Sequence, residues 1–258
     1  MKSIWTGDIG FGLVSIPVKL YSATQGSELD FDLLDKSDHA RIRYMRVNED
    51  TGKEVEWEDI VRAYDLNGKY IVLTPKDFEN ASPEKTKRIE IMEFVDESEI
   101  DSIYYETPYY VEPEKKGQKP YLLLREALRK TKKAGLGTYV LRNREHLCVI
   151  KVVNDLIVLN RIRFEEEIRN PEEVNAPVAK KINPGELKMA VTLIEQMTGD
   201  FKIGNYKDTY SAELLKVIKA KARGKKTTAP KLKVVHKRTD NLMEQLKASL
   251  GKKRRKTS

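Results

Sequence analysis

The feature that most constrains the fold is a long succession of strand-like runs interrupted by a single helical segment. Between residue 4 and about residue 165, short apolar or alternating runs such as "GKYIVLT" and "KRIEIMEFV" are separated by turn clusters such as "NEDTG" and "DLNG", which is typical of β-strands and hairpins. The one helical pattern is "PYLLLREALRKTKKAG", whose expected apolar face is Leu123, Ala127 and Leu128 and whose expected end is Gly135. Many strands with one helix favour a β-barrel or sandwich over an open sheet layered with helices.

The periodicity changes after residue 180, where apolar residues recur every three or four positions. Asn183 followed by Pro184 is a helix-start signal, and the stripe from Leu187 to Met197 predicts one amphipathic helix. A second is expected in "YSAELLKVIKAKARG".

The C-terminal part contains "GKKTTAP", a linker pattern, and then "TDNLMEQLKASLG", a short amphipathic helix with Leu242, Leu246 and Leu250 four positions apart. We therefore expect a mainly β core with some α at 1–180, a helical arm at 181–223, and a linker, short helix and basic tail at 224–258.

The net charge of +8 is distributed unevenly. Residues 201–258 contain 18 lysines and arginines against 4 acidic residues, whereas the other 200 residues contain 30 against 36. A basic extension on a mildly acidic body predicts contact with nucleic acid or another polyanion. The alternative is a tail that only keeps the protein in solution.

Cysteine usage and hydropathy indicate a cytoplasmic protein. Cys148 is the only cysteine, so no disulfide can form within the chain, which suits a reducing compartment. The apolar run "GFGLVSIPV" lies between Asp8 and Lys19 and is too short for a signal peptide. No run approaches the roughly 18 apolar residues of a membrane span, and we expect no membrane segment.

No pattern of catalytic residues stands out. His39, His146 and His236 are far apart and lack metal-ligand spacing, Cys148 lies in an apolar strand pattern, and "GDIGFG" matches no phosphate-binding loop. The run "FEEEIRN" is expected to be a solvated strand end, although a metal-dependent nuclease remains an alternative. We expect neither a metal nor a cofactor, and no enzymatic activity.

The most unusual charges lie in "HARIRYMR", where three arginines fall within six residues. In an extended strand, Arg41 and Arg43 share one face and Arg46 takes the other. Phosphate contact is one interpretation, with Lys53, Arg62 and Lys69 further along the same excursion. The other is cross-strand pairing with Glu54, Glu56 and Glu58. Spacing alone leaves both open.

Four stretches resemble the Ku family in its bacterial, homodimeric form. They are "IWTGDIGFGLVSIPVKLYSAT", "RIRYMRVNEDTGKEVEWEDIVRAYDLNGKYIVLT", "INPGELKMAVTLIEQM" and "NLMEQLKASL". The resemblance implies a β-barrel with a long strand bridge, here at about 30–75, and C-terminal helices. Arms of roughly 16 residues would reach about 50 Å at ~3.3 Å per residue.

The resemblance also implies a function. Two subunits would form a ring that encircles broken ends of double-stranded DNA regardless of sequence and recruits a multifunctional ATP-dependent DNA ligase for non-homologous end joining. The protein would then be cytoplasmic and nucleoid-associated. A basic protein that coats DNA or RNA through its tail is the second alternative. The implied DNA contacts are Arg41, Arg43, Arg46, Lys53, Arg62, Lys69, Lys252, Lys253, Arg254, Arg255 and Lys256. The implied ligase contacts are Leu242, Met243, Leu246 and Leu250, unless that helix folds back on the barrel.

Overall fold

The structure, a computed structural model, describes residues 1–81, 87–177, 182–225 and 242–250. The chain forms two compact units. The first comprises Met1–Gly26 and Asp30–Pro171, and the second comprises Ser27–Leu29 and Glu172–Ser258. The first contains the β-structure and the second the C-terminal helices.

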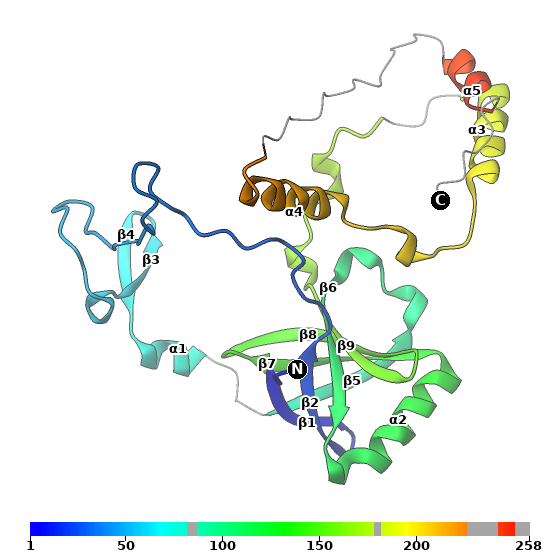
Figure 1. The fold of residues 1–258 in the computed structure, drawn as a ribbon. Helices are drawn as coiled ribbons and strands as arrows, with labels where there is room; N and C mark the ends of the chain where they lie inside the picture. Colours follow the sequence, from blue (N-terminus) through cyan, green and yellow to red (C-terminus); the bar gives the residue numbers. More distant parts are fainter. Residues whose placement is uncertain (82–86, 178–181, 226–241, 251–258) are drawn as a thin grey trace. The chain divides into compact units, whose positions relative to one another are not determined.

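Seven strands of the first unit close into a barrel in the order β1-β2-β6-β9-β8-β7-β5 (Figure 1). Neighbouring strands are antiparallel except for β1 and β5, which pair in parallel and close the barrel. The strands are β1 (Trp5–Phe11), β2 (Val14–Ser22), β5 (Arg88–Asp96), β6 (Tyr105–Pro113), β7 (Lys133–Leu141), β8 (Arg144–Val153) and β9 (Leu156–Ile162). The expected β-barrel is confirmed.

Alternation along each strand explains the barrel core. In β2, Ile16, Val18 and Leu20 are fully buried, because successive side chains point to opposite faces of a strand. Equivalent positions on the other strands complete one continuous apolar cluster. Gly12, with φ of 55°, makes the turn that separates β1 from β2.

Helix α2 (Gln118–Thr131) packs against the barrel (Figure 1). Its buried face consists of Tyr121, Leu124 and Leu128, which join the core cluster. The Tyr121 hydroxyl donates a hydrogen bond to the Val111 carbonyl (3.0 Å) and accepts one from the Ile157 amide (2.9 Å). Since β6 ends and β9 begins near these two residues, α2 covers that end of the barrel.

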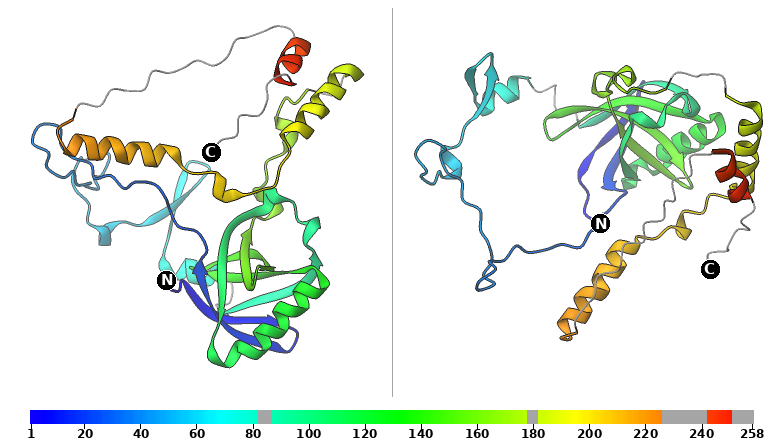
Figure 2. Two further views of the ribbon diagram at one scale, coloured as in Figure 1. Left: turned by 45° about the vertical axis from the view of Figure 1, so that its right-hand side comes forward. Right: turned by 90° about the horizontal axis from the view of Figure 1, so that it is seen from above.

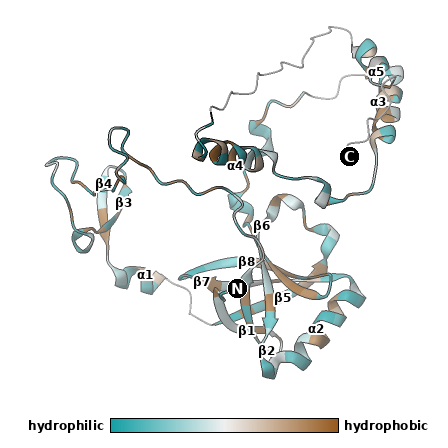
Figure 3. Ribbon diagram, in the orientation of Figure 1, coloured by the Kyte–Doolittle hydropathy of each residue, from teal (hydrophilic) through white to brown (hydrophobic). Residues whose placement is uncertain are grey.

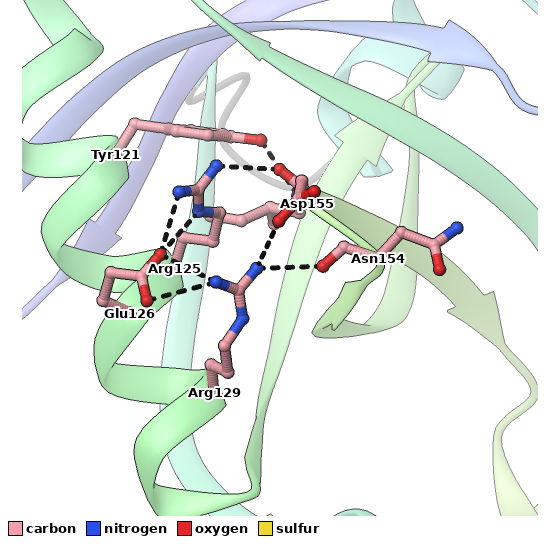
Figure 4. A network of polar contacts seen from close by, with 7 residues as sticks. Tyr121, Arg125, Glu126, Arg129, Asn154 and Asp155 are labelled. Atoms are coloured by element: carbon pink, nitrogen blue, oxygen red, sulfur yellow. Dashed lines mark hydrogen bonds and ion pairs between the residues drawn. The ribbon is translucent and has the colours of Figure 1, made fainter.

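A polar network holds the same helix to the β8–β9 turn (Figure 4). Arg129 donates to the Asn154 carbonyl (2.9 Å) and to the Asp155 carboxylate (3.0 Å), and Arg125 donates to the Asp155 carbonyl (2.9 Å). Glu126 accepts from both arginines. The helix is therefore fixed by polar contacts along one edge and by apolar packing beneath.

Two expectations about this helix are wrong. Leu123 and Ala127 are exposed, Leu123 by 72%, because the barrel contacts the face that carries Leu124 instead. The helix also ends before Gly135. Lys132 takes the left-handed conformation at its C-terminus, with φ of 55°, and Gly135 lies within β7, where the Ile91 side chain approaches within 3.2 Å of the place a β-carbon would occupy.

The excursion from residue 30 to residue 81, which we call the bridge segment, contains a two-stranded hairpin and a short helix. Its elements are β3 (Arg62–Leu66), β4 (Lys69–Leu73), α1 (Pro75–Ala81) and the 3-10 turn η1 (Trp57–Asp59). The expected "DLNG" turn is present. Asn67 and Gly68 both have positive φ, and the Gly68 amide donates to the Asp65 carboxylate (2.7 Å), as in two-residue hairpin loops.

The second unit contains the expected C-terminal helices. They are α3 (Pro184–Met197), α4 (Thr209–Ala222) and α5 (Leu242–Leu250). Asn183 caps α3 by accepting from the Gly185 amide, and Asp208 caps α4 by accepting from the Ser211 amide. The remaining described elements are 3-10 turns: η2 (Glu97–Glu99), η3 (Ser102–Tyr104), η4 (Lys115–Gly117), η5 (Glu165–Glu167), η6 (Pro171–Glu173) and η7 (Ile203–Asn205).

Candidate nucleic-acid interface

The bridge segment has no core of its own. None of its residues is buried, although it carries many large apolar side chains and has one apolar stretch in the β3–β4 hairpin (Figure 3). The exposed ones are Phe31, Leu33, Leu34, Ile42, Tyr44, Met45, Val47, Trp57, Ile60, Val61, Tyr64, Leu66, Tyr70, Ile71, Val72 and Phe78. So many exposed large apolar side chains on one segment favour an interaction site.

The "HARIRYMR" stretch is not the regular strand that its pattern predicts. Pairing in this region is limited to the isolated bridges Leu34↔Arg41 and Val47↔Glu54. Backbone hydrogen bonds flank these bridges, and residues 42–46 form no ladder. The face assignment assumed a regular strand, and since no continuous partner strand fixes the pleat here, it stays a prediction.

The three arginines have different surroundings. Arg41 forms an ion pair with Asp32 at 3.0 Å, and the Arg46 guanidinium lies over the Trp57 ring, 4.6 Å from its centroid. Among the described residues, Arg43 has no ion pair, and neither Arg43 nor Arg46 pairs with Glu54, Glu56 or Glu58. The expected alternative of cross-strand pairing with these glutamates is thus absent from this part of the chain.

The other expected cations of the bridge segment lie apart from one another. Lys53 follows the tight turn that begins at Asn48. Arg62 and Lys69 stand at opposite ends of the β3–β4 hairpin, since Arg62 is level with Leu73 and Lys69 with Leu66. The Arg62 guanidinium lies 5.5 Å from the centroid of the Phe78 ring.

Charge is segregated within the bridge segment. Residues 30–81 contain 8 lysines and arginines but 13 acidic residues, so the segment as a whole is acidic. Between Arg41 and Arg46, however, no acidic residue intervenes. A polyanion would therefore be attracted to this stretch more than to the rest of the segment.

Aromatic partners of the arginines were not expected from the sequence. Trp57 and Phe78 follow their arginines by 11 and 16 positions. Neither spacing is a recognisable motif, since the contacts arise from tertiary folding of the segment. Arginine stacked on an aromatic ring keeps its charge and its donors.

The C-terminal candidates are only partly described. The basic residues of the tail lie outside the described residues: Lys252, Lys253, Arg254, Arg255 and Lys256. Helix α5 lies against α3 (Figure 2). Met243, Leu246 and Leu250 are half-buried, and nothing is described of the Leu242 side chain.

The described residues contain no group of three or more His, Cys, Asp or Glu placed to hold a metal ion. Cys148 is fully buried, and burial raises the pKa of its thiol, as expected for an inert cysteine. The run Glu165–Glu167 forms the turn η5, not a strand end. Among the described helices, none has the length and apolar character needed to cross a membrane.

Comparison with known proteins decides the family. The family model of the Ku70/Ku80 beta-barrel domain matches residues 10–189. The chain belongs to the Ku family. Curated relatives with the name "Non-homologous end joining protein Ku" include one from Coxiella burnetii (strain RSA 331 / Henzerling II), 41% identical over 88% of this chain and 84% of its own length. One from Bacillus subtilis (strain 168) is 37% identical over 99% of this chain and 83% of its own length. One from Archaeoglobus fulgidus is 37% identical over 97% of this chain and 98% of its own length.

Ku membership agrees with the architecture described above. The matched residues 10–189 include the bridge segment and six whole strands of the barrel, together with the end of β1 and the start of α3. The likeness to the curated relatives extends further, over 88% of the chain or more in the examples given.

Proposed function

We propose that this chain binds the ends of double-stranded DNA without sequence preference and acts in double-strand break repair by non-homologous end joining. The observation that carries the proposal is the bridge segment of a Ku-family barrel, with Arg41, Arg43 and Arg46 gathered where no acidic residue intervenes. Arginines directed at phosphates read the DNA backbone and not the bases. The names of the relatives support the repair pathway.

The proposal includes a ring formed by two copies of the chain. Support comes from the bridge segment, which exposes large apolar side chains such as Tyr44 and Val61 and buries none. Exposed apolar surface of this extent favours association. A second copy offers the same surface, so the contact can close as a two-fold dimer.

Ligase recruitment is the third part of the proposal. Helix α5 carries Met243, Leu246 and Leu250 on one face, and such a stripe suits a helix laid into the groove of a partner protein. Because α5 lies against α3 and these side chains are half-buried, docking on a DNA ligase would replace the contact with α3. We assign the chain no chemical step and place its work at the nucleoid, in the cytoplasm.

Competition between linear and closed circular DNA tests the ring. Linear duplex should compete for the protein far better than closed circular DNA of equal length, because a ring needs an end to enter. Equal competition would refute the ring. A chain lacking residues 224–258 should still bind linear duplex. Complete loss of binding would mean that the tail binds the DNA, and would favour a protein that coats DNA through its tail.

The absence of catalysis is tested separately. End-labelled linear duplex incubated with the full chain and Mg²⁺ or Mn²⁺ should remain intact. Degradation that disappears on substitution of a carboxylate would establish a nuclease.

A further inference from the structure

A pocket of about 460 Å³ lies at the end of the barrel opposite α2. It lies where β2 and β9 end and where β6 and β8 begin. Its lining includes the polar side chains of Ser22, Thr107, Tyr109, Arg142, Arg144, His146 and Arg161. A pocket of this size accommodates a small ligand.

The interior of the barrel changes from apolar to polar at this end. Leu159 and Cys148 are fully buried and face the core. Two positions along the same strands, on the same face, stand Arg161 and His146. The interior of a small barrel is normally filled by packed side chains. At this end, polar side chains from several strands face the interior instead.

The pocket carries excess positive charge. A bulge in β6 at Glu106 sets this carboxylate beside Arg161, which donates to it through two nitrogens, one of them at 2.6 Å. That pair is neutral overall. Arg142 and Arg144 have no ion pair among the described residues, so their charges remain available to an anion.

The turn that presents these arginines has an unusual backbone. Arg142 and Asn143 connect β7 to β8 and both have positive φ, 53° and 65°. Glycine or asparagine usually occupies such positions. An arginine there is uncommon, and non-glycine residues in this conformation are often found at binding sites.

A buried aromatic neighbour holds the His146 ring at the pocket. Tyr139 is buried and pairs with His146 across β7 and β8, and their ring centroids are 5.6 Å apart. Burial, and then the neighbouring Tyr109 that lines the pocket, raise the pKa of the Tyr139 hydroxyl.

The protonation of His146 agrees with an anion site. Burial is the largest cause that lowers its pKa, followed by the nearby Arg161 and Arg144, while the Leu141 carbonyl and Glu106 act in the opposite direction. Without a bound anion the imidazole is therefore neutral near pH 7. A bound anion would offset the repulsion from the arginines and favour the protonated ring.

We propose that this end of the barrel is a phosphate-binding site, in which Arg142 and Arg144 hold the phosphate oxygens and His146 and the Thr107 hydroxyl complete the contacts. Guanidinium groups match the geometry of phosphate and bind it through paired hydrogen bonds. The recognised group is the phosphate, whether it belongs to a nucleic acid or to a small molecule. The site is separate from the arginines of the bridge segment and does not depend on the proposed function.

The first experiment uses inorganic pyrophosphate and the full chain without DNA. Saturable binding measured by calorimetry should weaken at least about tenfold in Arg144→Gln and in Arg142→Gln, because each removes a charged hydrogen bond. The matched control is Lys130→Gln, an exposed cation on α2 at the other end of the barrel, which should bind as the unaltered chain does. Equal losses in all three variants would overturn the proposal.

A second readout needs no substitution. Pyrophosphate should shift the imidazole resonances of His146 in the nuclear magnetic resonance spectrum of the unaltered chain. An unchanged His146 signal at saturating pyrophosphate would overturn the proposal, whatever the variants do.

The source of the phosphate is identified by competition. If duplex DNA removes the pyrophosphate-dependent shift of His146, the site belongs to nucleic acid. If the shift persists on the DNA-bound protein, the site belongs to a small phosphorylated molecule. If pyrophosphate does not shift the His146 resonances but the chain still binds DNA, this site is refuted and the proposed function is unaffected.

Discussion

The guanidinium of Arg46 lies 4.6 Å from the centroid of the Trp57 ring, and this contact orients the arginine without neutralising it. Arg41, by contrast, is paired with Asp32. The Arg41–Asp32 pair is largely exposed, so it contributes little and exchanges readily. Arg46 is thus held by a ring and Arg41 by a weak ion pair, whereas Arg43 has no ion pair among the described residues. These differences give the three arginines distinguishable expected effects.

Removal of charge at the bridge arginines should weaken DNA binding to the same extent for all sequences. For Arg43→Gln and Arg46→Gln we expect the slope of log affinity against log salt concentration to fall by about 0.9 for each DNA phosphate that the variant no longer neutralises. Arg41→Gln should have a smaller effect, because Asp32 already competes for that charge. Titrations of a short linear duplex at several salt concentrations measure the slopes, with Lys130→Gln as control. Unchanged slopes would remove these arginines from the interface.

Loss of the aromatic ring should behave differently from loss of the charge. Trp57→Ala removes the surface that orients Arg46 but leaves the number of cations unchanged. We expect affinity to fall by roughly the 0.5–1 kcal/mol of an exposed cation–π contact, about two- to fivefold, while the salt slope is retained. The same titrations test this. A reduced slope in Trp57→Ala would mean that Arg46 reaches DNA only when stacked.

Apolar alternation made the barrel strands predictable, because every inward position of a closed barrel must be filled from the chain itself. The bridge segment was harder to predict. Its apolar residues are as strand-like as those of β2, yet no continuous ladder covers residues 42–46, so local pattern and tertiary pairing disagree. The phosphate site was missed because Ser22, Thr107, His146 and Arg161 come from four strands, and no spacing along the chain links them.

The attachment of α2 predicts a specific loss of stability. Tyr121→Phe would leave the Val111 carbonyl without its donor and the Ile157 amide without its acceptor. Buried groups left unsatisfied cost about 1–3 kcal/mol. Urea unfolding should therefore show a lower midpoint at an unchanged m-value. Leu123→Ala, on the exposed face of the same helix, should change the free energy of unfolding by less than about 0.5 kcal/mol. Equal effects of the two substitutions would contradict the packing described for α2.

Acid should destabilise the barrel in two stages that can be separated. The charged and titratable groups around His146 are Arg144, Arg161, Glu106 and Tyr139. Because the pKa of His146 is lowered by folding, the unfolded chain binds a proton near pH 6.5 while the folded chain does not. The free energy of unfolding should therefore fall as pH drops below about 6.5 and level off below the folded pKa.

Glu106 affects the free energy of unfolding in a lower pH range than His146. The Arg161 hydrogen bond lowers the pKa of Glu106, so its contribution is complete above the unfolded value of about 4.3 and is lost as pH falls through the folded value. His146→Gln should flatten the pH dependence between about 5 and 7 and leave the more acidic limb intact. Urea titrations at intervals across pH 3–8 on both chains provide the measurement. If His146→Gln retains the full dependence between pH 5 and 7, another group controls stability in that range and His146 is not held neutral by its surroundings.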